Sequence, residues 1–232
     1  MKNYSPKEIK NIVLVGAPGS GKTTLAEAMA FEGKVIDRRG SIENNNTLSD
    51  NTDIEHEYKR SIYSTTLFTE FMGRKLNIID CPGSDDFCGN LFSAFKVGDV
   101  GVMLINAQNG WEVGNEIQSR YASILNKPLI GVINQLDADK ANYEATLESI
   151  KADSIVKPVV VQYPVNQGVN FDSFIDVLMM KMYRFTDENG TREELDIPED
   201  ELERAKAYNQ ELVETAAEYD DELMMLYFDK GS

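Results

Sequence analysis

Histidine and cysteine are nearly absent from this 232-residue chain, which contains one histidine and two cysteines. Cys81 and Cys88 are too few and too close together for a secreted disulfide framework, and no histidine or cysteine partners stand at zinc-ligand spacing. We therefore expect both thiols to be reduced and to serve in packing. The single histidine, His56, belongs to no catalytic or metal-binding constellation, which favours an exposed residue without a catalytic role.

Long hydrophobic runs are also missing. No stretch approaches the roughly 18 consecutive apolar residues that a membrane-spanning helix needs. Lys10 leads directly into an apolar strand, with no cleavage-site pattern before it. The sequence therefore predicts a cytoplasmic protein without a membrane partner.

Positive charge is scarce, because 23 Lys and Arg residues stand against 39 Asp and Glu residues and give a net charge of −16. This balance excludes a surface that wraps nucleic acid through its phosphates, so we expect no sequence-specific nucleic-acid partner. Residues 187–232 alone contain 16 acidic and 4 basic side chains. A solvated helix face is the favoured explanation, and a docking surface for a basic partner is the alternative.

Short apolar runs alternate with amphipathic stretches over the first 160 residues, which is typical of an α/β fold with a mostly parallel sheet and helices on both faces. The expected strands cover residues 11–15, 75–80, 100–106, 129–134 and 158–162. The expected helices cover residues 23–31, 86–95, 113–125 and 141–151. A turn at Met72-Gly73-Arg74 should fold residues 61–71 back as an antiparallel edge strand.

The pattern changes beyond residue 164. A strand-like segment over 174–183 is followed by a turn region rich in Gly, Thr and Asp, and then by helices over 199–219 and 221–228. Pro198 stands in the first turn of the former helix, where a missing N–H costs little. We therefore divide the chain into a larger domain of residues 1–160 and an acidic, mainly helical subdomain of residues 161–232.

A glycine-rich turn follows the first apolar strand and precedes a helix; it reads Gly16-Ala17-Pro18-Gly19-Ser20-Gly21-Lys22-Thr23. The N–H groups of such a turn converge on an anion at the positive end of the helix, so polyphosphate is the implied ligand. Lys22 would reach the β and γ phosphates, and the Thr23 hydroxyl would bind a bridging Mg²⁺. Similar turns also occur for packing reasons, but the strand and helix in the required places favour the nucleotide interpretation.

Two further motifs stand at strand ends, Asp80-Cys81-Pro82-Gly83 and Asn134-Gln135-Leu136-Asp137. Asp80 can hold Mg²⁺ through a water, and Gly83 lets a backbone N–H approach a γ-phosphate, although alone the motif is only a turn signature. The Asp137 carboxylate can accept hydrogen bonds from N1–H and the 2-amino group of guanine, although alone it could equally cap a helix. Together the three motifs predict a GTP-binding domain.

The segment of residues 37–60 is polar and has little apolar periodicity. A polar loop of this length inside a compact α/β domain is usually either disordered or functional. Because it follows the first helix after the phosphate loop, we expect a segment that senses the bound nucleotide.

On these residues the chain resembles the nucleotide-binding domain of bacterial elongation factor G, a translational GTPase that promotes translocation on the ribosome. The resemblance runs nearly end to end, and the tail over residues 197–224 resembles the subdomain inserted into that family's nucleotide domain. It implies a Ras-like P-loop NTPase fold with a smaller α+β subdomain, and GTP or GDP with Mg²⁺ as cofactors. It also implies a monomer that works with the ribosomal GTPase centre and with a ribosomal stalk protein.

The resemblance assigns roles to particular residues. It implies Mg²⁺ ligation by Thr23 and Asp80, and catalytic positions at Lys22 and Ser84. The implied nucleotide-binding residues are Gly16, Ala17, Pro18, Gly19, Ser20, Gly21, Lys22, Thr23, Thr24, Asp80, Gly83, Asn134, Gln135 and Asp137.

Two departures from the family weaken the expected chemistry. Ser84 stands where the family has a histidine that orients the attacking water, so hydrolysis should be slow or absent. Gln135 replaces a lysine whose long stem packs under the base and braces the phosphate loop. We therefore expect that brace to be lost and the affinity to fall, with guanine selectivity retained through Asp137.

The nucleotide-sensing segment departs as well. An ungapped alignment places Tyr63 at the family's Mg²⁺-binding threonine and Ser61 at a glycine, and a slip in register would bring Thr65 or Thr66 into use. The family also completes its sheet after the insert with a strand that this sequence does not contain, so we expect an incomplete C-terminal end.

Three functions remain open. The chain is a ribosome-associated GTPase, a nucleotide-gated switch that binds GTP without turnover, or a P-loop ATPase or small-molecule kinase. Asp137 at a strand end and the lack of a basic lid segment disfavour the third.

Overall fold

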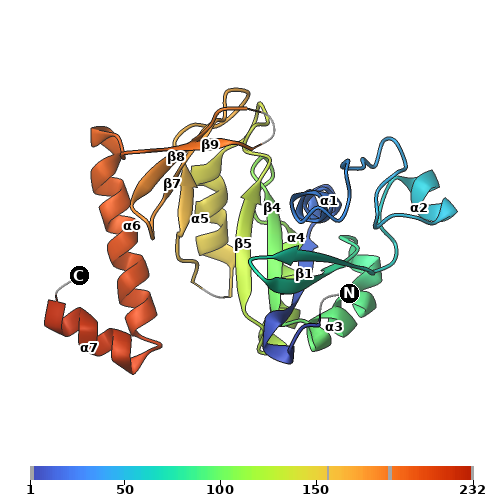
Figure 1. Cartoon of the computed structure of the whole chain (residues 1–232), viewed down its shortest axis with the longest axis horizontal. Helices are drawn as coiled ribbons and strands as arrows, with labels where there is room; N and C mark the ends of the chain where they lie inside the picture. The colour runs from blue at the N-terminus through green and yellow to red at the C-terminus, as the bar shows by residue number, and fades with distance from the viewer. Residues whose placement is uncertain (1–2, 156, 188–189, 231–232) are drawn as a thin grey trace. The chain divides into compact units, whose positions relative to one another are not determined.

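The computed structural model describes residues 3–155, 157–187 and 190–230. The chain divides into two compact units, which Figure 1 colours from blue at the N-terminus to red at the C-terminus. The first unit comprises Met1–Gln135 and Glu144–Ile155, and the second comprises Leu136–Tyr143 and Val156–Ser232. The boundary expected between residues 160 and 161 lies inside the second unit. Residues 188–189 and 231–232 of the expected subdomain lie outside the described residues.

The first unit contains a five-stranded sheet in the order β2-β3-β1-β4-β5, in which all pairs are parallel except β2 with β3. The antiparallel edge strand and its turn at Met72 and Gly73 agree with the sequence prediction. The expected α/β fold is thereby confirmed. The strands are β1 Ile9–Gly16, β2 Thr65–Phe71, β3 Arg74–Asp80, β4 Val100–Asn106 and β5 Leu129–Asn134.

Helices cover both faces of this sheet, because alternate residues of β1 point to opposite sides. Val13 and Val15 join a core with Phe95 of α3, whereas Leu14 joins Ala26 of α1 in a second core. The helical elements are η1 Pro6–Glu8, α1 Lys22–Glu32, α2 Asp53–Tyr58, η2 Asp85–Phe87, α3 Cys88–Val97, α4 Val113–Ile124 and α5 Tyr143–Asp153. Cys81 is a buried free thiol, as a packing role requires, and the side chain of Cys88 lies outside the described part of the structure.

The prediction of a fifth parallel strand over residues 158–162 is wrong. Residues 157–161 have no regular secondary structure, and β6 (Gln162–Pro164) begins where the expected strand would end. The backbone carbonyl of Val161 instead accepts a hydrogen bond from the Val177 N–H at 2.9 Å, next to the second sheet. An apolar run indicates a strand but does not specify the sheet that it joins.

The second unit contains an antiparallel sheet in the order β6-β7-β8-β9. The single strand expected over 174–183 is in fact a hairpin of β7 (Ser173–Asp176) and β8 (Lys181–Phe185), closed where the Met179 N–H donates to Asp176 Oδ1 at 2.8 Å. Strand β9 (Arg192–Leu195) was not expected at all. The subdomain therefore combines a sheet with helices and is α+β, as the family resemblance implied.

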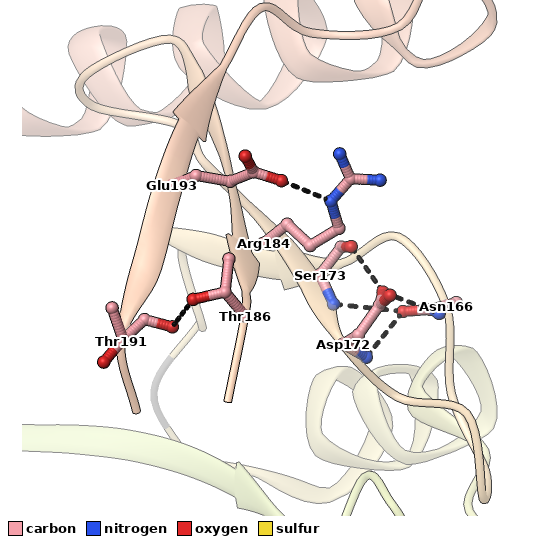
Figure 2. A network of polar contacts seen from close by, with 7 residues as sticks. All are labelled: Asn166, Asp172, Ser173, Arg184, Thr186, Thr191 and Glu193. Carbon is pink, nitrogen blue, oxygen red and sulfur yellow. Dashed lines mark hydrogen bonds and ion pairs between the residues drawn. The ribbon is translucent and has the colours of Figure 1, made fainter. Parts of the chain in front are cut away.

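Polar side chains form contacts between and beside the strands of this sheet, as Figure 2 shows. Arg184 on β8 and Glu193 on β9 form an ion pair with an N–O distance of 2.8 Å. Asn166 Oδ1 accepts the backbone N–H groups of Asp172 and Ser173, each at 3.2 Å, at the start of β7. These polar contacts supplement the ring contacts of Phe174 on β7 with Tyr183 and Phe185 on β8.

Two helices follow the sheet, α6 (Glu199–Ala217) and α7 (Asp221–Lys230), close to the expected ranges. Pro198 is the N-cap of α6, and three acidic residues occupy the first turn, where the helix dipole favours negative charge. The Arg204 guanidinium lies 4.5 Å from the ring centre of Tyr163, which attaches α6 to β6. Within the described ranges, no helix is both long and apolar enough to cross a membrane.

We expect Phe95→Ala to destabilise the first unit by about 3–5 kcal/mol, because the buried ring fills the space between α3 and the sheet. Trp111, the only tryptophan, packs against the same core, so its fluorescence during urea unfolding reports on this unit. Phe71→Ala is the matched control, because Phe71 is 55% exposed. The control should change the free energy of unfolding by less than about 0.5 kcal/mol, and equal losses would contradict this description of the core.

Candidate nucleotide-binding site

The glycine-rich turn connects β1 to α1 at the carboxyl edge of the first sheet. Gly16 has a φ of +138°, and a Cβ atom there would collide with the backbone carbonyl of Leu104 on β4. Gly21, the N-cap of α1, has a φ of +96°, and a Cβ atom there would strike the side-chain amide of Asn134. Both positions therefore require glycine. The turn delivers its backbone to the N-terminus of α1, where an anion is favoured.

Lys22 lies within this turn. Its ammonium donates to the backbone carbonyls of Gly16 at 2.9 Å and Ala17 at 3.0 Å. Burial lowers the pKa of Lys22, and the neighbouring carboxylate of Asp80 is the largest of the groups that oppose the shift. A bound phosphate would give this buried cation an anionic partner in place of two neutral carbonyls.

The Thr23 hydroxyl donates to Asp80 Oδ2 at 2.7 Å, which joins the start of α1 to the end of β3. Burial raises the pKa of Asp80 to about 6, although the Thr23 hydroxyl lowers it. Asp80 Oδ1 is buried and has no hydrogen-bond partner among the described residues. A hydroxyl beside a carboxylate with a free oxygen is a donor set that fits Mg²⁺, which prefers oxygen ligands and keeps bonds to phosphate and water. No group of three His, Cys, Asp or Glu side chains in the described ranges could hold a metal ion by itself.

Gly83 brings the second motif against the phosphate loop. A Cβ atom at Gly83 would lie 2.5 Å from Lys22 Nζ and 2.9 Å from the backbone nitrogen of Pro18. Only glycine therefore permits this approach. Next to it, the Ser84 hydroxyl donates to Asp86 Oδ2 at 3.4 Å, so the residue at the family's histidine position is partly exposed and carries no positive charge.

Asn134 and Gln135 reach the phosphate loop from the end of β5. Asn134 Nδ2 donates to the Ser20 carbonyl and Gln135 Nε2 donates to the Gly19 carbonyl, each at 2.8 Å. Asn106 Nδ2 donates in turn to Gln135 Oε1 at 2.8 Å. The expected loss of the brace on the phosphate loop is therefore wrong, because the shorter glutamine makes it with a side-chain amide.

The buried Gln118 on α4 is a further brace that the motifs do not reveal. Its Oε1 accepts the Gly16 N–H at 2.5 Å, and its Nε2 donates to the Gly16 carbonyl at 3.2 Å. This amide therefore satisfies both backbone groups of the first glycine of the loop. Since 102 positions separate the two residues, no local sequence signal could have identified the contact.

The nucleotide-sensing segment is more ordered than a polar loop suggests. Thr52 and Glu55 form a capping box that starts the short helix α2. Glu55 Oε1 also accepts the N–H groups of Ile62 at 3.0 Å and Tyr63 at 3.2 Å, before β2 begins. Glu27 on α1 accepts the N–H of Gly40 at 2.8 Å, so acidic side chains fix the segment at both ends.

The structure also distinguishes among the candidate hydroxyls of this segment. Tyr63 is 55% exposed, and Thr65 on β2 donates to the Ser49 carbonyl at 2.9 Å. Thr66 pairs with Ile79 within the sheet. Ser61 Oγ instead lies 3.3 Å from Thr23 Oγ1, so the position expected to be a glycine in the family provides the hydroxyl beside the Thr23–Asp80 pair.

Asp137 belongs to the second unit, two residues beyond Gln135. Its segment is held there by the Leu136 carbonyl, which accepts the Gly168 N–H at 2.7 Å. The contact of Asp137 with guanine stays a prediction. Thr24 is an exposed residue of α1. It directly follows Lys22, which binds the loop carbonyls, and Thr23, which binds Asp80.

Comparison with known proteins agrees with this arrangement. The sequence profile described as the elongation factor Tu GTP binding domain matches residues 7–223. Among solved structures, the crystal structure of the Thermus thermophilus protein ttk003000868 matches with a TM-score of 0.88 and 31% sequence identity. The match covers 96% of this chain and 33% of that chain, so the present chain spans about a third of its relative.

The profile match covers most of the chain, including the phosphate loop, Asp80 and the Asn134-Gln135 pair. It confirms the family predicted from the sequence at the level of translational GTPases, and the family binds guanine nucleotides. The chain belongs to the elongation factor Tu GTP binding domain family, the nucleotide-binding domain of translational GTPases.

Proposed function

We propose that this chain is the GTP-binding domain of an elongation factor G-like factor that acts on the ribosome and hydrolyses GTP slowly or not at all. The observation that carries the proposal is the convergence of Lys22, Thr23 and Asp80 at the start of α1. These side chains offer a cation for the phosphates and an oxygen pair for Mg²⁺. Residues 1–160 would form the GTP-binding domain, and residues 161–232 would form the inserted acidic subdomain.

The proposed roles follow from the contacts. Lys22 binds the β and γ phosphates, Thr23 and Asp80 hold Mg²⁺, and Asp137 reads guanine. When bound, Mg²⁺ neutralises charge on the phosphates. Gly83 presents its N–H to the γ-phosphate, and Asn134 and Gln135 keep the loop in place for binding. The loop backbone from Gly16 to Thr24 surrounds the phosphate groups.

Slow hydrolysis is proposed because of Ser84. Its hydroxyl can hold a water but cannot place the positive charge of an imidazolium near the γ-phosphate. The Ser84 hydroxyl donates a hydrogen bond to the carboxylate of Asp86, so the charge beside it is negative. This contact favours the alternative function as well, in which the domain is a nucleotide-gated ribosome-binding switch that does not turn GTP over.

The proposed partners are the ribosomal GTPase centre and a ribosomal stalk protein. Support for the latter comes from the charge of residues 187–232, where 16 acidic side chains stand against 4 basic ones and would attract a basic surface. We further propose that the protein acts as a monomer in the cytoplasm.

Guanine selectivity gives the first test. In competition against a labelled guanine nucleotide, GTP should displace the label, ITP should compete about tenfold less well because it lacks the 2-amino donor, and ATP should not compete measurably. Asp137→Asn should reduce the preference for GTP over ITP. Equal displacement by ATP would support a P-loop ATPase or kinase instead.

Lys22→Ala should weaken nucleotide binding by roughly 10- to 100-fold, because the phosphates lose a charge-assisted hydrogen bond. Isothermal titration calorimetry with GDP and a non-hydrolysable GTP analogue measures the change. Lys7→Ala removes the same charge at an exposed position and should leave both affinities within about twofold. Comparable affinities of the two variants would show that the loop does not bind phosphate.

Ser84→His should accelerate ribosome-stimulated GTP cleavage by at least about tenfold, because it restores a water-orienting imidazole. Single-turnover hydrolysis by the full-length protein, with and without ribosomes, provides the measurement. Ser93→His, at an exposed position of α3, should leave the rate unchanged. If Ser84→His leaves it unchanged too, the other departures in the site limit hydrolysis.

A further inference from the structure

Asp50 is a buried carboxylate that the proposed function does not yet use. The residue is 4% exposed, and neither of its carboxylate oxygens has a hydrogen-bond partner within the described ranges. Its backbone is well held, because its N–H donates to Thr47 Oγ1 at 3.3 Å and its carbonyl lies 2.9 Å from His56 Nε2. The structure thus fixes the main chain of Asp50 and leaves the negative charge of its side chain without a donor.

Asp50 lies near the Thr23–Asp80 pair, because it interacts electrostatically with Asp80. The charge of Asp50 raises the pKa of Asp80, and Asp50 also interacts electrostatically with Lys22. The hydroxyl of Ser61 is near enough to influence Asp50, although the contact does not reach normal hydrogen-bond geometry, and it lies 3.3 Å from Thr23 Oγ1. Asp50 therefore approaches the proposed Mg²⁺ site from the nucleotide-sensing segment.

The unpaired atoms in this region are all oxygens. They include both carboxylate oxygens of Asp50, Oδ1 of Asp80 and the hydroxyl of Ser49. This hydroxyl is near enough to lower the pKa of Asp80, although the contact does not reach normal hydrogen-bond geometry. Lys22, the nearby cation, donates to two backbone carbonyls and forms no ion pair among the described residues. Buried carboxylate oxygens without donors are unfavourable unless a cation compensates them, and a set of oxygen donors is the chemistry that Mg²⁺ selects.

We propose that Asp50 joins the coordination shell of the nucleotide's Mg²⁺, so that the nucleotide-sensing segment closes on the metal through a carboxylate. This inference rests on the proposed function, because it requires a bound guanine nucleotide with its metal ion. Thr23 and Asp80 hold the ion from the phosphate loop and β3, and Asp50 with the neighbouring Ser61 holds it from the segment before β2. The exposed Tyr63 takes no part.

A charged ligand has a different consequence from the neutral hydroxyl expected at this place. Without the metal, the Asp50 carboxylate and the nucleotide phosphates repel each other, so the segment cannot close. With the metal, the carboxylate adds an attraction that a hydroxyl would not provide. Order in the segment should therefore depend on the divalent cation as strongly as on the nucleotide.

Manganese binding tests this proposal. We would load the full chain with a non-hydrolysable GTP analogue and measure free Mn²⁺ by electron paramagnetic resonance. Asp50→Asn should weaken Mn²⁺ binding about tenfold or more, in line with the effect of removing a group that holds a metal site. Asp53→Asn makes the same charge change at an exposed position three residues away and should leave Mn²⁺ binding within about twofold.

Nucleotide affinity measured in EDTA separates the possible outcomes. Asp50→Asn should bind the analogue in EDTA at least as tightly as the wild type does, because the repulsion is removed. A wild-type chain that binds no guanine nucleotide would overturn the proposed function. Normal nucleotide binding together with unchanged Mn²⁺ binding by Asp50→Asn would overturn the role of Asp50 alone. If Asp50→Asn raised the affinity for the analogue equally with and without metal, Asp50 would only hinder nucleotide binding to the empty site. That result would also overturn the proposal.

A measurement on the wild-type chain avoids any folding defect of the variant. Hydrogen exchange of the backbone amides in residues 47–52 should slow when Mn²⁺ is added to the nucleotide-bound protein. Exchange that depends on nucleotide and is insensitive to the metal would contradict closure through Asp50.

Discussion

Parallel pairing of β1 with strands on both of its sides is the constraint on which the site depends. The register places Leu14 opposite Asp80 of β3 and Gly16 opposite Leu104 of β4, so the phosphate loop and the acidic residue leave the sheet at one edge. The 2.7 Å hydrogen bond from Thr23 to Asp80 then joins helix to strand. A shift of one residue would turn Asp80 to the other face of the sheet, so the buried core of β1 also sets the chemistry at its end.

Sequence patterns identified the helices and strands whose apolar residues recur with a regular period. They failed for strands whose formation depends on pairing with a neighbouring strand. Leu178 and Met179 are apolar, which suggested a continuous strand, yet they form the exposed turn between β7 and β8. Strand β9 carries mostly charged residues, and it joins the sheet by antiparallel pairing with β8, across which Arg184 and Glu193 form an ion pair. Neither feature follows from local preference, because each depends on a neighbouring strand.

The candidate site likewise contains residues that the sequence predicts and residues that it does not. Glycine and lysine positions in the phosphate loop could be predicted, because local backbone geometry and charge demand those residues. The bracing amides could not, because Gln118 and Asn106 reach the site from distant elements. Gln135 shows why a substitution alone misleads. The length of its side chain argued for a lost contact, whereas its left-handed backbone, with a φ of 60°, accompanies an amide that bridges Asn106 and the Gly19 carbonyl.

Cys81 follows Asp80 directly, and it is fully buried in the core that contains Val13 and Val15 of β1. Burial raises the pKa of this thiol to about 12, although the Ser64 hydroxyl lowers it. Alkylating reagents attack thiolates, so at neutral pH they can modify Cys81 only while the end of β3 is transiently open. The rate of that modification therefore measures how often the end of β3 opens, at the residue next to the buried Asp80.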